Sequence, residues 1–391
     1  MKIEASERIK GLSSYAFADV DNEVAKLKKL GVTPIDFGVG DPKEPTPGLI
    51  RNYCKRALDK RKESGYPSYI GSKDFREEIA KWTKERFNVS LDFEKEITSS
   101  IGAKEAVFNF PEAYVNPGDY VLMPNPGYPP YERGTLFAEG QPFFLPLNEE
   151  NNFMPNLEEI PVDIVKKSKI LWINYPNNPT GAVANKSFLK EVVDFGHDNG
   201  IVIASDECYT ELYFDEKPMS ILEVDREGVV VIQSLSKRSN MTTYRVGWLM
   251  GDENLIDVFK KLKTNVDSGT PTFIQDAAIA ALSDEKHVET ARLDYKKKRD
   301  IMVDALTSAG LAECRPKATI YIWQKVPEGM SSVDFAKKLL DKDIGVVTTP
   351  GSWISNTVNE ENPGEGFVRL ALVPTVAECK GAAEKLKNLK C

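Results

Sequence analysis

Three short apolar runs decide the fold: KILWIN at residues 169–174, IVIAS at 201–205 and GVVVIQ at 228–233. Each run is followed by polar or glycine-containing sequence, which is typical of a buried strand that reaches the edge of a sheet. Residues 185–200, between the first two runs, repeat apolar side chains at helical spacing and stop at a glycine. The order strand, helix, strand predicts right-handed crossovers and a mostly parallel sheet.

Further alternation of strands and helices surrounds this central part. Residues 120–123 (YVLM) predict another buried strand, closed by two nearby prolines. The segment from about 284 to 310 has apolar residues at helical spacing and no proline, so it predicts one long helix that connects to a second, smaller α/β unit. In that unit we expect strands at 320–324, 345–348 and 367–372, and helices at about 333–340 and from 376.

Composition and charge narrow the class of protein. The 391 residues include 51 lysines and arginines against 59 aspartates and glutamates, for a formal net charge of -8. The hydrophobic fraction of 41% is that of a globular protein and excludes a disordered or collagen-like chain. Because the balance is acidic, broad attraction to nucleic acid or to anionic membranes is disfavoured, and we expect small-molecule partners.

Histidines and cysteines are few. His197 and His287 are the two histidines, which excludes a histidine-rich metal cluster, and we expect no metal site. The five cysteines are scattered singly without a Cys-x-x-Cys pair, which indicates reduced thiols and a cytoplasmic protein. We find neither the apolar stretch of a signal peptide nor the roughly 18 to 20 apolar residues of a membrane span.

Three polar loops follow successive predicted strands, and each has an ordinary structural interpretation when taken alone. YPNNPTG at 175–181 has the residues of a turn. Asp206, in SDECY at 205–209, is typical of a helix N-cap, and Lys237, in SLSKRSN at 234–240, of a solvated surface lysine. Because parallel strands end at one edge of a sheet, these loops are expected to meet there and form a site, where a lysine could condense with an aldehyde.

Taken together, these motifs resemble the fold-type-I, pyridoxal-phosphate-dependent aminotransferases of the class I and II group. The resemblance extends from about Tyr15 to Arg369 and adds SLSKRSNMTTYRVGW at 234–248 and FVRLAL at 367–372. It implies an α/β fold with a mostly parallel seven-stranded sheet in a large cofactor-binding domain at residues 48–285. A smaller α/β domain would comprise residues 1–47 and 286–391.

The resemblance also implies roles around the pyridine ring of the cofactor. Lys237 would form an imine with the cofactor aldehyde and then act as general base and acid. Asp206 would pair with the pyridinium nitrogen and keep the ring an electron sink. Tyr209 and Asn178 would hydrogen-bond the phenolic oxygen, and the ring of Tyr128 would stack on the cofactor face.

A second group of residues is implied for the cofactor phosphate, which needs N–H donors and positive charge. This group comprises Gly102, Ala103, Lys104, Ser234, Ser236 and Arg245. Tyr66 resembles the tyrosine that reaches the phosphate of the neighbouring subunit, which implies a homodimer with shared active sites.

For the substrate, Arg369 matches the arginine that grips the α-carboxylate through a bidentate pair. Gly40 resembles the glycine whose backbone lies against the same carboxylate, Asn178 is also a substrate-side residue, and Tyr15 resembles a substrate-contacting tyrosine of one subfamily.

Several stretches, among them KTNVDSG at 263–269 and KATIYIW at 317–323, most resemble the LL-diaminopimelate aminotransferases of lysine biosynthesis. These enzymes exchange an amino group with 2-oxoglutarate. N-succinyldiaminopimelate and aspartate or broad-specificity aminotransferases share the cofactor motifs, and the same fold hosts pyridoxal-phosphate-dependent β-lyases. One departure from many relatives is Arg238, where they carry a neutral residue.

Overall fold

The computed structural model describes the whole chain except residues 1–2, 12–23, 26, 30, 64 and 391. Within the described residues, a seven-stranded sheet has the order β2-β8-β7-β6-β5-β3-β4. β8 is antiparallel to both of its neighbours, and the remaining pairs are parallel. The strands are β2 (Ile97–Ser100), β3 (Tyr120–Asn125), β4 (Gln141–Pro146), β5 (Ser168–Asn174), β6 (Val202–Asp206), β7 (Val229–Ser234) and β8 (Gly247–Gly251). The expected mostly parallel sheet is confirmed.

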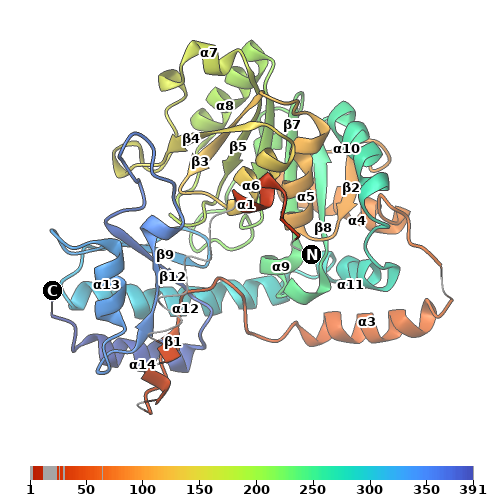
Figure 1. Cartoon of the computed structure of the whole chain (residues 1–391). Coiled ribbons are helices and arrows are strands. Elements are labelled where there is room, and N and C mark those ends of the chain that lie inside the picture. Colours follow the sequence, from red (N-terminus) through yellow and green to blue (C-terminus); the bar gives the residue numbers. More distant parts are fainter. Residues whose placement is uncertain (1–2, 12–23, 26, 30, 64, 391) are drawn as a thin grey trace.

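Helices cover both faces of this sheet (Figure 1). Alternate residues of each strand point to opposite faces, so each strand contributes to two separate cores. Leu171 and Ile173 pack with α4, α8 and α11, whereas Ile170 and Trp172 pack with α5, α6 and α10. The helices of this large lobe (residues 48–282) are α3 (Gly48–Lys60), α4 (Lys73–Phe87), α5 (Ala103–Asn109), α6 (Pro129–Phe137), α7 (Val162–Val165), α8 (Lys186–Asn199), α9 (Leu235–Arg238), α10 (Glu253–Val266) and α11 (Thr272–Leu282).

A small lobe (residues 32–47 and 309–390) is built around a three-stranded sheet of order β11-β12-β9, within the described part of the chain. Its core is separate and includes Ile322, Phe335 and Leu370. A short parallel pair joins β1 to β10 beside this sheet. The elements are β1 (Ile35–Asp36), β9 (Tyr321–Lys325), α13 (Ser332–Leu339), β10 (Val346–Val347), β11 (Thr349–Pro350), β12 (Phe367–Ala371) and α14 (Val376–Leu386).

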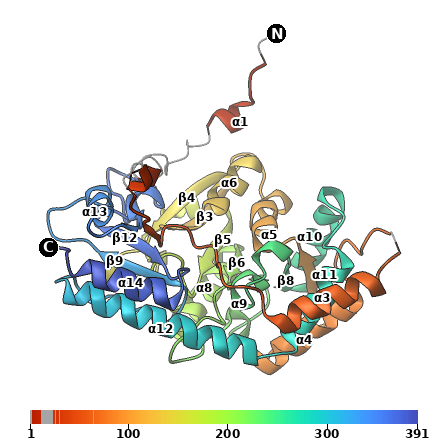
Figure 2. The same ribbon diagram turned by 90° about the horizontal axis from the view of Figure 1, so that it is seen from below.

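The long helix α12 (Lys286–Ser308) joins the two lobes, as its proline-free sequence predicts. Figure 2 shows α12 running beneath both lobes, with α14 alongside it at the small-lobe end. Tyr295, Met302 and Leu306 of α12 lie in the small-lobe core. A further short helix, α1 (Glu7–Lys10), lies near the N-terminus. Among the described helices, we find none long and apolar enough to cross a membrane.

The strand ends place the predicted loops side by side. In the register of the sheet, Asn174 at the end of β5 pairs with Asp206 at the end of β6, and Asp206 pairs with Ile232 of β7. The loops that begin at residues 175, 207 and 235 therefore leave the sheet at the same edge. This edge faces the small lobe and holds the site described next.

Candidate active site

A cavity of about 760 Å³ lies where the carboxyl edge of the large sheet meets the small lobe. Twelve predicted site residues line it: Gly40, Ala103, Lys104, Tyr128, Asn178, Asp206, Tyr209, Ser234, Ser236, Lys237, Arg245 and Arg369. They come from both lobes and from segments more than 300 residues apart, so the fold brings together what the sequence scatters.

Asp206 lies at the centre of the large-lobe side and is 5% exposed. Tyr131 Oη donates to its Oδ2 (2.9 Å), and the backbone N–H of Cys208 donates to its Oδ1 (3.2 Å). Burial raises the pKa of this carboxyl, and the two donors oppose that shift. A cationic group placed against Asp206 would therefore be strongly favoured over a neutral one.

Lys237 is in the short helix α9, which begins directly after β7. Ser234 caps this helix by accepting from the N–H of Ser236. The ammonium of Lys237 donates to the backbone carbonyl of Gly40, which belongs to the small lobe. The lysine thus spans the cavity from the large sheet to the segment beside Arg369.

The end of the cavity beside Arg245 is rich in hydrogen-bond donors. Arg245 has a left-handed backbone (φ 52°), and its guanidinium lies against Gly102. A Cβ at position 102 would lie 2.5 Å from Arg245 Nη2, and Gly102 also has φ 73°, so this close approach requires glycine. Ser234 Oγ lies 2.9 Å from Ser236 Oγ beside this pair. Arginine, hydroxyls and free backbone N–H groups at a helix start form a donor set suited to a phosphate dianion.

Arg369 lies on β12 at the opposite end of the cavity. Its Nη1 donates to Asn178 Oδ1 (3.1 Å) and its Nη2 to Gly38 O (3.0 Å). Its buried Nε has no hydrogen-bond partner among the described residues. Since a carboxylate accepts from two guanidinium nitrogens at once, this planar fork with an unpaired donor suits a carboxylate ligand.

Tyr321 is a cavity residue that the sequence reasoning did not assign. Its hydroxyl lies 3.0 Å from Tyr209 Oη, and the guanidinium of Arg369 lies 4.7 Å from its ring centroid. A Cβ at Gly40 would lie only 2.1 Å from Tyr321 Oη, which explains the glycine there. Strand register gives the reason for the omission, because Tyr321 pairs with Ala371 on β12 and reaches the site through a partner strand.

Tyr131 was likewise not assigned a role, although it supports Asp206. It stacks on Trp172 with ring centroids 4.9 Å apart and 22° between the planes. The available signal was its position in PGYPPYERG at 126–134, three residues after Tyr128 and therefore one helical turn further along.

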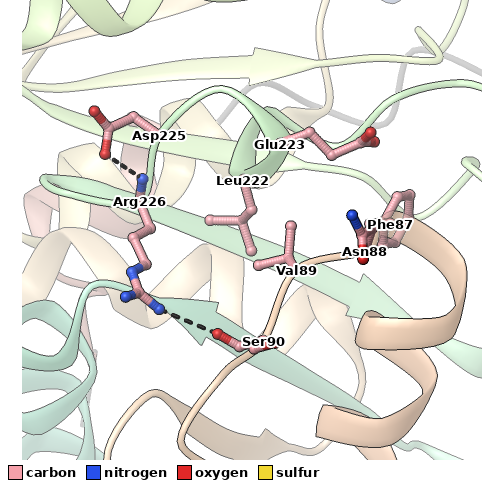
Figure 3. Close-up of a pocket in the computed structure, with 8 residues that line it drawn as sticks. All are labelled: Phe87, Asn88, Val89, Ser90, Leu222, Glu223, Asp225 and Arg226. Atoms are coloured by element: carbon pink, nitrogen blue, oxygen red, sulfur yellow. Dashed lines mark hydrogen bonds between the residues drawn. The ribbon is translucent and has the colours of Figure 1, made fainter.

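Three predicted site residues are not among the described residues that line the cavity, and one of them, Gly102, lies against the guanidinium of Arg245. Tyr66 does not line the cavity and is 84% exposed. Tyr15 lies outside the described residues. A separate cavity of about 500 Å³, formed by Phe87, Asn88, Val89, Ser90, Leu222, Glu223, Asp225 and Arg226, contains none of the predicted site residues (Figure 3).

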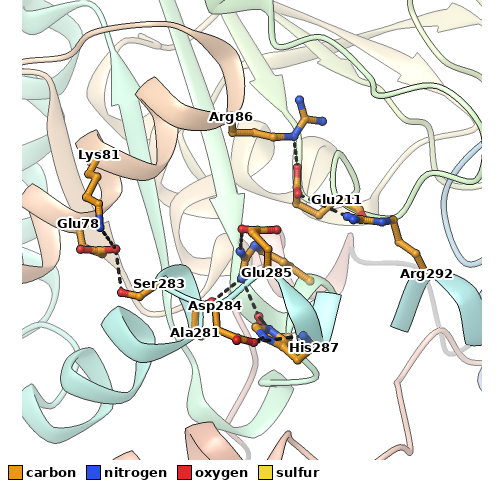
Figure 4. A network of polar contacts seen from close by, with 12 residues as sticks. Glu78, Lys81, Arg86, Glu211, Ala281, Ser283, Asp284, Glu285, His287 and Arg292 are labelled. Atoms are coloured by element: carbon orange, nitrogen blue, oxygen red, sulfur yellow. Dashed lines mark hydrogen bonds and ion pairs between the residues drawn. The ribbon is translucent and has the colours of Figure 1, made fainter. Parts of the chain in front are cut away.

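A buried polar network lies behind Lys237 and ties α9 to the start of α12. Arg238 is 2% exposed, donates to Ala281 O (2.7 Å) and pairs with Glu285. Ser239 Oγ lies 2.9 Å from His287 Nε2. Figure 4 shows the surrounding contacts, including Glu211 between Arg86 and Arg292. The positive charge of Arg238 is thus compensated by Glu285, on the side away from the cavity.

The sequence matches known proteins along almost its full length. The family profile described as aminotransferase class I and II matches residues 32–386. The chain belongs to the class I and II aminotransferases. An LL-diaminopimelate aminotransferase of Aquifex aeolicus is 45% identical, with 99% of each chain covered. One from Halothermothrix orenii is 43% identical over 99% of this chain and 98% of its own. The apo structure of BacF from Bacillus subtilis superposes with a TM-score of 0.92 at 31% identity, covering 100% of this chain and 99% of that chain.

Aminotransferases of this family use pyridoxal 5'-phosphate, and the cavity of this aminotransferase fits that cofactor. A buried carboxyl whose pKa is raised by burial, a lysine, and a separate cluster of phosphate donors occupy one continuous space. The side chain of Asn178 offers its oxygen to Arg369, which leaves its amide N–H groups available to a ring oxygen. The cavity therefore offers residues of the chemistry that the ring and the phosphate of this cofactor require.

Proposed function

We propose that this aminotransferase moves an amino group between LL-diaminopimelate and 2-oxoglutarate, as a step of lysine biosynthesis. The observation that carries the proposal is the full-length similarity to several LL-diaminopimelate aminotransferases at 40 to 45% identity. The cavity supports it, since about 760 Å³ accommodates an elongated amino acid together with the cofactor.

Substrate binding is assigned to the small-lobe end of the cavity. Arg369 would hold the α-carboxylate through two parallel N–H bonds, one of them from the Nε that has no partner among the described residues. The Gly40 backbone would lie against the same carboxylate, and the missing Cβ keeps that space clear of Tyr321. This orientation would place the α-amino group towards Lys237.

Proton transfer is assigned to Lys237. Bound pyridoxal phosphate supplies an electron sink, which makes the proton on the substrate α-carbon more acidic. The amine of Lys237 would take that proton at Nζ and return it to the carbon on the other side of the amino nitrogen, which is a 1,3-proton shift. The Gly40 carbonyl already accepts from Nζ, so the lysine is held on the side of the cavity where the α-carbon would lie.

The remaining predicted residues would hold the cofactor. Asp206 would face the ring nitrogen, while Tyr209 and Asn178 would donate to the ring oxygen and Tyr128 would cover one face. Arg245, with the cluster Gly102, Ala103, Lys104, Ser234 and Ser236, would bind the phosphate. All of these residues except Gly102 line one cavity, and Gly102 lies against Arg245, which supports the assignment.

A panel of amino donors with 2-oxoglutarate tests the proposed substrate. The donors are LL-diaminopimelate, its N-succinyl form, aspartate and an aromatic amino acid, and glutamate formation is measured. We expect the highest kcat/KM for LL-diaminopimelate. A higher value for N-succinyldiaminopimelate or aspartate would assign the enzyme to one of those activities instead.

We also propose that the enzyme acts as a homodimer, with Tyr66 reaching the cofactor phosphate of the neighbouring subunit. The exposure of Tyr66 and its absence from its own cavity support this. Mixed dimers of K237A and Y66F subunits test it, because one of their two sites would contain both native residues. We expect activity above that of either parent, whereas a Tyr66 acting within its own subunit would give no such gain.

Two coarser predictions stay with this proposal. A cytoplasmic location is supported by the described cysteines, Cys54, Cys208, Cys314 and Cys379, which form no disulfide. A division into domains of residues 48–285 and of residues 1–47 with 286–391 is supported by the separate cores of the two sheets.

A further inference from the structure

The long connection at residues 354–366 of the small lobe forms part of the cavity wall. It joins a short 3-10 helix (Gly351–Trp353) to β12, the strand that holds Arg369. Connections of this length in a compact protein are uncommon and are often binding loops. Ile354, at its beginning, lines the cavity together with Tyr128 and Arg369.

The connection has a fixed internal structure. Val358 and Glu361 exchange two backbone hydrogen bonds (2.8 and 3.0 Å), and the intervening Asn359 and Glu360 both have positive φ, at 50° and 69°. This is the geometry of a two-residue hairpin turn. At its base, Asn362 Nδ2 donates to Ser352 O (3.4 Å), so the far side of the loop returns to its starting point. The position of Ile354 is therefore set by a preformed loop.

A two-bond contact fixes this loop to the large lobe. Asn125 Nδ2 donates to Asn356 O, and Asn356 N–H donates to Asn125 Oδ1, both at 2.8 Å. Asn125 is 2% exposed and stands at the end of β3, three residues before Tyr128. Asn125 therefore fixes the position of the loop that contains Ile354 relative to the segment that contains Tyr128.

Ile354 supplies apolar surface to the cavity from the small lobe, the lobe that also holds Arg369. Among the described lining residues, Val39 and Ile354 have the branched aliphatic side chains, and both belong to the small lobe. Val39 is 57% exposed, whereas Ile354 is half-buried. The polar groups of a long dicarboxylic amino acid lie at its ends, and its methylene groups require an apolar surface between them.

We propose that Ile354 selects long substrates by packing against their methylene chain, and that Asn125 is a positioning residue which holds Ile354 in place through Asn356. The proposal rests on the proposed function. One extra methylene in an apolar pocket changes discrimination by about 10- to 200-fold at most, so a measurable preference for chain length is expected.

The test uses the holoenzyme and a series of straight-chain α-amino dicarboxylates of increasing length: aspartate, glutamate, 2-aminoadipate and 2-aminopimelate, with LL-diaminopimelate alongside. For I354A we expect kcat/KM to fall about tenfold for the long members and to change less than about twofold for aspartate. N125A is expected to give the same dependence on length with a smaller amplitude. V358A, a change in the exposed part of the same loop, is the matched control and should leave the series unchanged.

Equal losses at every chain length in I354A, or the same profile in V358A, would overturn the inference. So would an unaltered enzyme whose kcat/KM does not depend on chain length. The absorbance of the bound cofactor reports whether each variant folds. If N125A does not fold, N125D replaces it, because aspartate keeps the acceptor for Asn356 N–H and loses the donor to Asn356 O. Failure of LL-diaminopimelate as a substrate of the unaltered enzyme counts against the proposed function alone, because the dicarboxylate series still measures the effect of Ile354.

Discussion

The two ends of the cavity are built in different ways. The cofactor end is formed by loops that directly follow neighbouring strands β5, β6 and β7 of one sheet. The substrate end combines Gly38 and Gly40, Asn178, Tyr321, Ile354 and Arg369, which come from both lobes. The cofactor end is therefore fixed by the sheet, whereas the geometry of the substrate end depends on how the lobes pack. We expect substitutions at the cofactor end to change kcat, and substitutions at the substrate end to change KM and selectivity.

K237A should have the largest effect, because Lys237 is the one residue assigned to proton transfer. We expect loss of transamination by about 10⁴-fold or more, the upper range for a lost general acid and base. Borohydride reduction of the native enzyme followed by peptide mapping should place the cofactor label on Lys237. K261A, a change at an exposed lysine, is the control for turnover. Label on another residue, or turnover near that of the native enzyme, would contradict the assignment.

D206N should come next. It removes the buried negative charge and keeps the size of the side chain, so the first half-reaction with glutamate should slow on the order of 100-fold, as for other preorganised charge partners. The amide oxygen can still accept from Cys208 N–H, and the amide N–H group that takes the place of Oδ2 can donate to Tyr131 Oη, so both contacts can persist. Stopped-flow absorbance measures the rate, and an unchanged rate would exclude this role for Asp206.

R369K probes the opposite end of the cavity. Lysine retains the charge but loses the fork that donates to Asn178, to Gly38 and to a carboxylate. Loss of one charged hydrogen bond costs about 2 kcal/mol, so we expect KM to rise about 10- to 100-fold with a smaller change in kcat. Steady-state kinetics check this split, with R315K, on the exposed surface of the small lobe, as control. A pure loss of kcat would remove the contrast between the two ends.

The same contrast governs what could be predicted from the sequence. Asp206 and Lys237 follow apolar runs that are recognisable on their own, and the runs at 169–174, 201–205 and 228–233 form β5, β6 and β7 with ends within one residue of those predicted. β8 was not expected, since an antiparallel strand inserted between β7 and β2 leaves no local sign of its place in the sheet. Tyr321 and the contact of Asn125 with Asn356 were missed because they depend on strand register and on a pairing 231 residues apart.

The smallest effect on activity is expected for E207Q, the neighbour of Asp206 on the far side of the cofactor end. Glu207 is 2% exposed and does not line the active-site cavity; Ser205 Oγ and Ile221 N–H donate to its Oε1 (3.1 and 2.9 Å). Because burial raises the pKa of Glu207 from 4.5 to about 7, the folded protein retains a proton there that the unfolded chain releases. The stabilisation is complete below pH 4.5 and is lost as the pH rises to about 7.

Glutamine cannot ionise, so E207Q should lack this pH dependence while keeping kcat close to that of the native enzyme. Between pH 4.5 and 7 the native free energy of unfolding should fall by about 3 kcal/mol relative to E207Q, and the difference should be constant at higher pH. Chemical unfolding at several pH values measures it, with E216Q, a change at an exposed glutamate, as control. Parallel pH profiles would mean that Glu207 is ionised in the folded protein. A large loss of kcat in E207Q would instead mean that Glu207, on the opposite face of the sheet from Asp206, also contributes to the cofactor end.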